Sequence, residues 1–496
     1  MVRQAHHERA HTTNGRTPRT GARHERRSPR TGARHEWGTV GSASSTGAAA
    51  SSNRYTASSP QTEQGSMTAP TDRYGNSLST DAATAALYIE GVDAMLSASD
   101  DLMVRSDAVV ASNPNFALGH VLCARTLASY GRGSEALLAI SKARDLLVNT
   151  FSVSDRERGH VHALGLLIEG RGAEALVAIK SHLSIYPRDA VVLQPATGIF
   201  GLIGFSGRID REAEFLALMN EYAAHYANDW WFSSIHAFAE CEAGFHDAAA
   251  KRVQRSLEMN PRNGNAAHVQ AHLHYEFQDD NGGAAFLREW LSWYPKTSLL
   301  RSHLSWHLAL VELSLGRVDA AWQLFRDDFD TTQAHAPPLN ALTDIVSWLW
   351  RADLAEGVAR PQEWQAVAER VAVVLPKFGV VFGDAHRAVM YAKSGDSNAL
   401  AALREAIAAT SDTRPAMRAA GVVGEALVAA TEARWHEVID RLESVDVDVV
   451  RIGGSRAQRD LVVATLMTAL HQTGQTERLA MLRARRPQVR PLPLMR

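Results

Sequence analysis

From Asp81 onward, apolar residues recur with the spacing of an α-helix. Long Ala- and Leu-rich stretches place them at positions i, i+3, i+4 and i+7, which is the pattern of helices with one buried face. Alternating runs of β-branched residues, which would indicate strands, are short and scattered. The pattern therefore predicts an all-α body.

Prolines divide this helical pattern into units of similar length. Pro114, Pro187, Pro261 and Pro295 lie in similar contexts and are separated by 73, 74 and 34 residues, which is about two, two and one units of a 34-residue repeat. A helix pair of that length cannot bury its apolar face alone and must stack on its neighbours. The sequence predicts a tetratricopeptide-like α-solenoid, in which stacked helix pairs form a superhelix.

Glycines that precede small residues mark the turns of these helix pairs. Glycine permits a chain reversal without steric cost, and the following alanines let the second helix pack closely on the first. We expect turns near five of them: Gly131, Gly170, Gly244, Gly282 and Gly316.

The first 66 residues differ in composition from the rest. They hold ten Arg and four Glu, few large apolar side chains, and the string PRTGARHE at Pro18–Glu25 and again at Pro29–Glu36. Such a segment cannot bury enough apolar surface to offset the entropy cost of ordering it. We therefore expect residues 1–66 to be a disordered basic tail and residues 67–496 to be a single helical-repeat domain. The tail is either a basic arm that contacts nucleic acid or a translated DNA repeat before a true start at Met67, and its lack of interleaved aromatic residues favours the second interpretation.

Charge and cysteine content exclude several classes of protein. The 496 residues carry 52 Lys and Arg against 54 Asp and Glu, which argues against a nucleic-acid or membrane-surface binder held by bulk charge. Two cysteines, Cys123 and Cys241, cannot form a disulfide framework or a four-thiolate zinc site. No apolar run is long enough to span a bilayer, and no export signal is evident. We expect a cytoplasmic protein without nucleic-acid or membrane partners.

The strongest sign of chemistry is a pair of histidines that occurs in two successive units. His268, His272 and Glu276 are each four residues apart, so they share one broad helix face. The next unit repeats the spacing with His303 and His307. Because neighbouring repeats present equivalent faces side by side, we expect the two pairs to converge in one pocket.

Three interpretations of these histidines stay open. With a carboxylate they suit a zinc ion or another borderline metal, and they equally suit metal-free acid–base catalysis in which a carboxylate orients an imidazole. Alternatively, they hydrogen-bond one another as buried struts. Asp384 and His386 are candidates for a third contribution, although residues two apart on a helix point in different directions. No motif for a nucleotide or redox cofactor is evident, so a divalent metal is the one cofactor that the histidines suggest.

Tryptophans crowd the middle of the chain. Filling the space between helices is their usual role, although aromatic residues also line solenoid grooves, and Trp306 lies between two of the histidines as a candidate binding residue. The set is Trp230, Trp231, Trp290, Trp293, Trp306, Trp322, Trp348, Trp350 and Trp364.

Six blocks of the sequence are long and unusual. They are GNSLST (75–80), NPNFALGH (113–120), AHVQAH (267–272), SHLSWHLALVELSLGR (302–317), the FxDAH of residues 382–386, and RIGGSRAQRD (451–460). With these blocks the chain resembles the tetratricopeptide repeat protein 38 family, from about Tyr74 to the end. The resemblance implies a helical-repeat fold and a cytosolic protein, and it names no substrate. The positions that it carries over are His268, His272, His303, His307, Asp384, His386, Arg459 and Asp460.

The chain departs from that family within the segment QPATGIFGLIG. Where the family tends to show a His-Asp pair, this sequence has Pro195 and Ala196. An activity that requires the pair would be lost or changed in this chain.

The motif Gly453–Ser455 is expected to open a helix that begins near Arg456. Its glycines permit positive φ, and Ser455 can cap the helix. A helix N-terminus with Arg459 beside it can receive a carboxylate or phosphate. A simple turn between helices is the alternative.

Two functions from different classes fit these observations. The first is a small-molecule site lined by the histidines, with hydrolase- or lyase-like acid–base chemistry. The second is a non-catalytic protein- or peptide-binding scaffold, whose affinity would come from groove aromatics and rim charges. Either ligand would lie on the concave face, and the sequence leaves self-association open.

Overall fold

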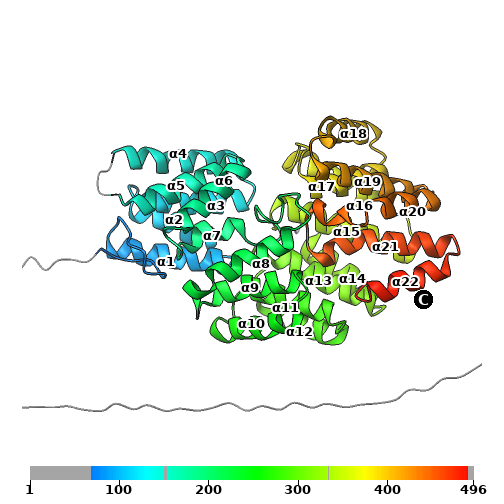
Figure 1. Ribbon diagram of the computed structural model, residues 1–496, viewed down its shortest axis with the longest axis horizontal. Helices are drawn as coiled ribbons and strands as arrows, with labels where there is room; N and C mark the ends of the chain where they lie inside the picture. Colours follow the sequence, from blue (N-terminus) through cyan, green and yellow to red (C-terminus); the bar gives the residue numbers. More distant parts are fainter. Residues whose placement is uncertain (1–68, 150–152, 333–334, 490–496) are drawn as a thin grey trace, which may run out of the picture. The chain divides into compact units, whose positions relative to one another are not determined.

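The computed structural model describes residues 69–149, 153–332 and 335–489. No strand occurs among these residues, although Thr71 and Ser77 form an isolated β-bridge. The predicted tail lies outside the described residues, so its disorder and the start at Met67 stay predictions. The helices (Figure 1) are α1 Ala82–Ser97, α2 Leu102–Ser112, α3 Ala117–Ser129, α4 Gly133–Asn149, α5 Asp155–Ile168, α6 Gly172–Leu183, α7 Ala190–Leu193, η1 Gln194–Ala196, α8 Arg211–Tyr222, η2 Ala223–Tyr226, α9 Trp230–Glu242, α10 His246–Met259, α11 Gly264–Glu276, α12 Asp280–Trp293, α13 Arg301–Ser314, α14 Val318–Leu324, the π-helix η3 Phe325–Phe329, α15 Pro338–Glu356, α16 Pro361–Val374, α17 Val381–Ser394, α18 Ser397–Ser411, α19 Pro415–Thr431, α20 Trp435–Ser444, η4 Asp448–Ile452, α21 Arg456–Gln472 and α22 Thr476–Arg485.

The helices pair with their neighbours and stack on the pair after that. Consecutive helices pack together, such as α3 with α4, α5 with α6 and α9 with α10. Helices two apart pack as well, such as α9 with α11, α11 with α13 and α13 with α15. Contacts limited mainly to nearest and next-nearest elements are the pattern of a solenoid. The protein is an all-α solenoid of stacked helix pairs, which confirms the predicted fold class.

The odd-numbered helices of the middle of the chain form the more buried row. In α9, every residue from Trp231 to Glu242 is buried, whereas α10 buries only Ala249, Val253 and Ser256. Helices α11, α13 and α15 are likewise buried on most sides. A helix surrounded by protein can present polar side chains to an interior site, so this row is where chemistry is expected.

Four of the five predicted turns lie at the predicted glycines. Gly131, Gly170, Gly244 and Gly316 have φ of 76°, 77°, 88° and 77°, a conformation that costs glycine little. The expectation for Gly282 is wrong. It lies in the first turn of α12, where its N–H donates to the capping side chain of Asp279 (2.9 Å). The residue with positive φ at that turn is Gln278 instead (φ 59°).

Tryptophan fills the core, as its usual role predicts. Six of the nine tryptophans are buried, while Trp293 is 40% exposed. The buried ones are Trp231, Trp290, Trp306, Trp348, Trp350 and Trp364.

Segments far apart in the sequence also contact each other. The guanidinium of Arg211, at the start of α8, donates to the carbonyl oxygens of Val450 (2.9 Å) and Gly454 (2.6 Å), 239 and 243 residues away. Arg451 donates in return to the carbonyl oxygen of Gly207 (3.2 Å). These contacts join the loop before α8 to the segment that leads into α21.

Candidate functional site

Four imidazoles from α11 and α13 converge in the middle of the buried row. His268 and His272 come from α11, and His303 and His307 come from α13, which packs against it. One nitrogen of each ring lies within 4.8 Å of the nitrogens of the other three. All four side chains are buried. The two pairs converge as predicted but do not share one pocket: His268 and His303 line one cavity, His307 lines another, and His272 lines neither. We call these residues the four-histidine group.

A carboxylate on α15 orients one of the four rings. Oδ2 of the buried Asp344 accepts a hydrogen bond from Nδ1 of His303 (2.8 Å). A neutral imidazole carries a single N–H. When neutral His303 uses that hydrogen for Asp344, its Nε2 lone pair faces the other histidines.

The Nε2 atom of His268 lies at the centre of the group. It is 3.0 Å from Nε2 of His303 and 2.9 Å from Nε2 of His272. If His268 Nε2 carries a hydrogen, that one hydrogen lies close to both His272 Nε2 and His303 Nε2. If His268 Nε2 carries a lone pair instead, that lone pair faces the lone pair of His303 Nε2. Neutral rings therefore leave this cluster incompletely satisfied.

A cation among the four nitrogens would satisfy it. Imidazole nitrogens bind zinc at 2.0–2.1 Å, which places the nitrogens of a tetrahedral site about 3.3 Å apart. The contacts around His268 are only slightly shorter than this. The donor type suits a borderline divalent metal, although the full set of four nitrogens spans up to 4.8 Å and would have to draw together around an ion.

Burial keeps most of these rings neutral. It lowers the pKa of His272 to about 3, with the neighbouring His303 adding to the effect. Burial also lowers the pKa of His268 and of His307 well below the usual range, and nearby imidazoles contribute to both shifts. At pH 7 these three rings offer lone pairs to a metal or to an acidic proton of a ligand.

Glu242, at the end of α9, places a second carboxyl group beside the cluster. Its Oε1 is 3.8 Å from Nδ1 of His272, and its Oε2 accepts a hydrogen bond from the backbone N–H of Arg456 (3.0 Å). Burial, followed by repulsion from Glu212, raises the pKa of Glu242 to about 7. A carboxyl group that titrates near neutrality is suited to acid–base catalysis. Sequence reasoning missed it because no spacing relates it to the histidines.

The four-histidine group forms part of the walls of two cavities. The larger, which we call the large cavity, has a volume of about 860 Å³ and is lined by His268, His303 and much of the segment from Gln194 to Ser206. Small-molecule sites commonly have volumes of about 300–1,000 Å³. The departure from the resembled family, at Pro195, therefore lies in the wall of this cavity.

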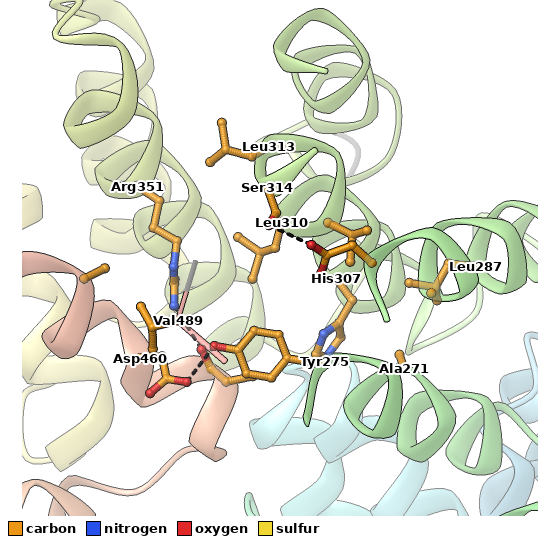
Figure 2. Close-up of a pocket in the computed structure, with 15 residues that line it drawn as sticks. Ala271, Tyr275, Leu287, His307, Leu310, Leu313, Ser314, Arg351, Asp460 and Val489 are labelled. Carbon is orange, nitrogen blue, oxygen red and sulfur yellow. Dashed lines mark hydrogen bonds between the residues drawn. The ribbon is translucent and has the colours of Figure 1, made fainter. Parts of the chain in front are cut away.

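The second cavity is small, about 70 Å³, and is lined by His307 together with Tyr275, Arg351 and Asp460. Figure 2 shows the Tyr275 ring between Asp460 and His307. The Tyr275 hydroxyl donates to Asp460 Oδ2 (2.6 Å). Asp460, a predicted binding residue, thus lines the same small cavity as His307. The Tyr275 ring separates the two side chains.

Three further predicted residues have partners of their own. Glu276 lies 3.7 Å from His246 Nε2 and 3.9 Å from Arg456 Nη1, outside the four-histidine group. Asp384 pairs with Arg387 (2.6 Å), while His386 Nδ1 donates to the carbonyl oxygen of its own helix at Phe382 (2.8 Å). Asp384 and His386 therefore point apart, as their spacing suggested.

Trp306 packs directly on the cluster. Its ring stacks on His303, with centroids 5.2 Å apart and planes 12° apart, and its Nε1 donates to Ser347 Oγ (3.0 Å). It is fully buried and does not line the large cavity. In this position it fixes the orientation of the His303 ring.

The motif before α21 folds as predicted. Gly453 and Gly454 have φ of 95° and 73°, and Ser455 caps the helix through a hydrogen bond from Gln458 N. The helix N-terminus already receives a carboxylate of this chain, that of Glu242. Arg459 donates to the carbonyl oxygen of Gly454 and pairs with Glu212.

A second buried histidine cluster was missed entirely. Oδ2 of Asp189 accepts hydrogen bonds from His160 Nδ1 (3.0 Å), His182 Nε2 (3.0 Å) and Arg156 Nη1 (2.7 Å). We call these four residues the Asp189 group. They come from α5, α6 and the turn before α7, and no repeated spacing in the sequence predicts that they lie together.

Comparison with known proteins adds little to this description. No protein-family model matches the chain. Among solved structures, the chain is similar to one described as the crystal structure of the P58(IPK) TPR domain, at 15% sequence identity over 80% of this chain and 99% of that one, with a TM-score of 0.20. We base no conclusion on so low a score. Fold and site together define an all-α helical-repeat protein with a buried four-histidine group, and none of its described helices is long and apolar enough to cross a bilayer.

Proposed function

We propose that the protein binds a small molecule in the large cavity and that the four-histidine group carries acid–base chemistry of the hydrolase or lyase type. The observation that carries this proposal is the placement of His268 and the Asp344-oriented His303 in the wall of that cavity. A carboxylate that orients an imidazole is the arrangement of a general base, and the base nitrogen here is Nε2 of His303, which faces Nε2 of His268 at 3.0 Å. Glu242, beside His272, is the companion acid.

A divalent metal is the alternative occupant of these nitrogens, since a lone pair that holds a metal cannot also act as a base. His268, His272, His303 and His307 are the residues that would hold it, because neutral rings alone do not satisfy the contacts around His268. Asp344 accepts a hydrogen bond from Nδ1 of His303 and so would orient its other nitrogen, Nε2, toward the metal, as carboxylates do in metal sites with histidine ligands. A bound metal of this class supplies a Lewis acid and lowers the pKa of coordinated water.

The family assignment also belongs to the proposal. We assign the chain to the tetratricopeptide repeat protein 38 family on the six sequence blocks, and the helical-repeat fold supports this assignment. A cytoplasmic location follows from it.

A protein- or peptide-binding scaffold is the alternative. In that function the histidines would be struts, and removing them would deprive buried partners such as Asp344 of a hydrogen bond, at about 1–3 kcal/mol for each. The pocket would not need them for binding.

The test is to purify the full-length protein from its own host and to identify bound small molecules by mass spectrometry and metals by elemental analysis. We expect a bound small molecule that is lost in the double variant His268→Ala/His303→Ala while circular dichroism stays that of the wild type. The matched control is His436→Ala/His471→Ala, which changes two exposed histidines. Equal capture by both double variants, or capture of peptides alone, would favour the scaffold.

A further inference from the structure

The large cavity contains positive charge and no negative charge. Its lining residues include Arg125 and Arg414 as well as His268 and His303, and none of the lining residues in the described part of the chain is Asp or Glu. Arg414 is exposed at the cavity edge, whereas Arg125 is partly buried on α3. The electrostatic character of the cavity therefore depends mainly on Arg125.

The guanidinium of Arg125 is incompletely paired. Nη2 donates to the side-chain oxygen of Gln194, which is neutral. Nη1 is enclosed and has no hydrogen-bond partner within the described residues. Desolvation lowers the pKa of Arg125 to about 10, so the group is still charged at pH 7.

Buried arginines of the chain differ in their partners: Arg351 donates to Ser347 and to the carbonyl oxygen of Ala457, whereas two others pair with carboxylates. Arg156 has Asp189 at 2.7 Å and Arg387 has Asp384 at 2.6 Å. Within the described residues Arg125 has no such carboxylate. An enclosed charge without a counter-charge is costly for a folded protein, and breaking a buried pair is strongly destabilising. Arg125 thus resembles one half of an ion pair whose other half would come from a ligand.

The rest of the cavity wall is largely apolar. Phe200, Phe205 and Phe238 line it, with several Leu and Ile side chains beside them. Phe238 also contacts the rings of His268 and His272, with centroids 5.2 and 5.1 Å apart. A ligand with a hydrocarbon or aromatic body would bury its apolar surface against this wall.

We infer that the large cavity takes an organic anion whose carboxylate or phosphate head pairs with Arg125 and whose apolar body lies against the phenylalanines. A guanidinium pairs with either head group, and because Nη1 of Arg125 is enclosed, the head group would meet its remaining N–H groups. This inference rests on the proposed function and names the class of substrate for the same site.

The test is calorimetric titration of the full-length protein with octanoate, octyl phosphate and the neutral 1-octanol at constant ionic strength. We expect one or both anions to bind at least tenfold more tightly than 1-octanol. The tighter of the two identifies the head group. Equal affinity for the anions and the alcohol, or no binding of either anion, would overturn the inference.

Variants of Arg125 decide whether this residue is responsible. Arg125→Gln should weaken binding of the anion tenfold or more and leave the affinity for 1-octanol unchanged. Arg125→Lys should have an intermediate affinity for the anion, because it keeps the positive charge and loses the planar guanidinium. The control Arg132→Gln removes an exposed arginine that is paired with Glu135 and should change nothing. A melting temperature of Arg125→Gln at or above that of the wild type would show that it folds. Unchanged anion affinity in a folded Arg125→Gln variant would contradict the inference.

The outcome separates this inference from the proposed function. If a neutral molecule is captured in a histidine-dependent manner, the proposed function stands and the anion inference fails. If octanoate binding depends on Arg125 but the His268→Ala/His303→Ala variant and the wild type capture the same molecules, the anion site stands and the histidine chemistry fails.

Discussion

The two buried histidine clusters of this protein use the same residue type in opposite ways. In the Asp189 group, one carboxylate oxygen accepts three hydrogen bonds, two from imidazoles and one from a guanidinium. In the four-histidine group, imidazole nitrogens face one another, and Asp344 contacts only one ring. The first cluster has an anion at its centre, although His160 Nε2 and Arg156 Nε have no hydrogen-bond partner among the described residues, whereas the second cluster has no anion at its centre.

The difference shows that a central carboxylate partner, and not the number of histidines, distinguishes a structural histidine cluster from a candidate binding site. Burial would raise the pKa of Asp189, but the hydrogen bonds and charges of His160, His182 and Arg156 outweigh it and hold that pKa well below its usual range. The carboxylate of the Asp189 group is therefore a fixed anion that ties three helical segments together. The four-histidine group has no comparable anion at its centre and borders two cavities.

The largest expected effect is a loss of stability in mild acid, caused by the four-histidine group. The pKa of an unfolded histidine is 6.5, and folding lowers that of His268, His272 and His307. Between the folded and unfolded values the unfolded state binds more protons, so the free energy of unfolding falls as pH drops below 6.5 and is fully restored above it. His272, whose pKa is lowered to about 3, costs about 2 kcal/mol at pH 5, and His268 and His307 add to the loss in the same direction. Urea unfolding at pH 7, 6 and 5 measures this loss, and a flat profile would refute it.

The second effect concerns the Asp189 group. Asp189→Asn removes the anion that Arg156, His160 and His182 share and leaves a buried guanidinium without its counter-charge. We expect the free energy of unfolding at pH 7 to fall by about 3–5 kcal/mol, as measured by urea denaturation. Asp440→Asn, which neutralises an exposed carboxylate, is the control and should be nearly neutral. A loss below about 1 kcal/mol would mean that the group is not a strut.

The third effect tests the segment that joins the Asp189 group to the large cavity. A Cβ atom at Gly201 would lie 2.1 Å from the carbonyl oxygen of Thr197, so Gly201→Ala must distort the cavity wall. Overpacking of this kind costs about 1–3 kcal/mol, and thermal unfolding measures it. Gly133→Ala is the control, because no atom lies within 4 Å of its added Cβ. Equal melting temperatures for the two variants would contradict the strain at Gly201.

The smallest effect on stability is expected at the centre of the four-histidine group. His268→Leu keeps the side-chain volume and removes both short nitrogen contacts, so the free energy of unfolding should change by less than about 1 kcal/mol. The same variant should lose the visible absorption that cobalt(II) gives when bound to the wild type. If instead His268→Leu is as destabilising as Asp189→Asn, the two clusters are both struts and the comparison fails.

Much of the fold could be predicted because its signals are local and repeated. Four turn glycines and the cap at Ser455 follow from the geometry that glycine permits and from the hydrogen bond that a serine can offer. Gly282 was misplaced because Asp279 caps α12 three residues earlier and Gln278 adopts the left-handed conformation instead. A non-glycine residue with positive φ leaves no mark in the sequence.

The site could be predicted only as far as the repeat spacing reached. The pairs His268/His272 and His303/His307 occupy equivalent positions of successive units. Their convergence could be predicted because neighbouring units present equivalent positions on a common face. Asp344, Glu242 and Arg125 come from other helices at unrelated spacings. Their roles depend on the way that the stacked helices bring distant positions together, which no local pattern encodes.

The contacts of Arg211 with Val450 and Gly454 have a consequence for the order in which the chain is synthesised. The earlier helix pairs can stack as they leave the ribosome, because each needs only its neighbours. The carbonyl partners of Arg211 emerge some 240 residues later, and Arg414, at the edge of the large cavity, also belongs to this late part. The loop before α8, part of which lines the large cavity, therefore lacks these partners until the last part of the chain has been synthesised.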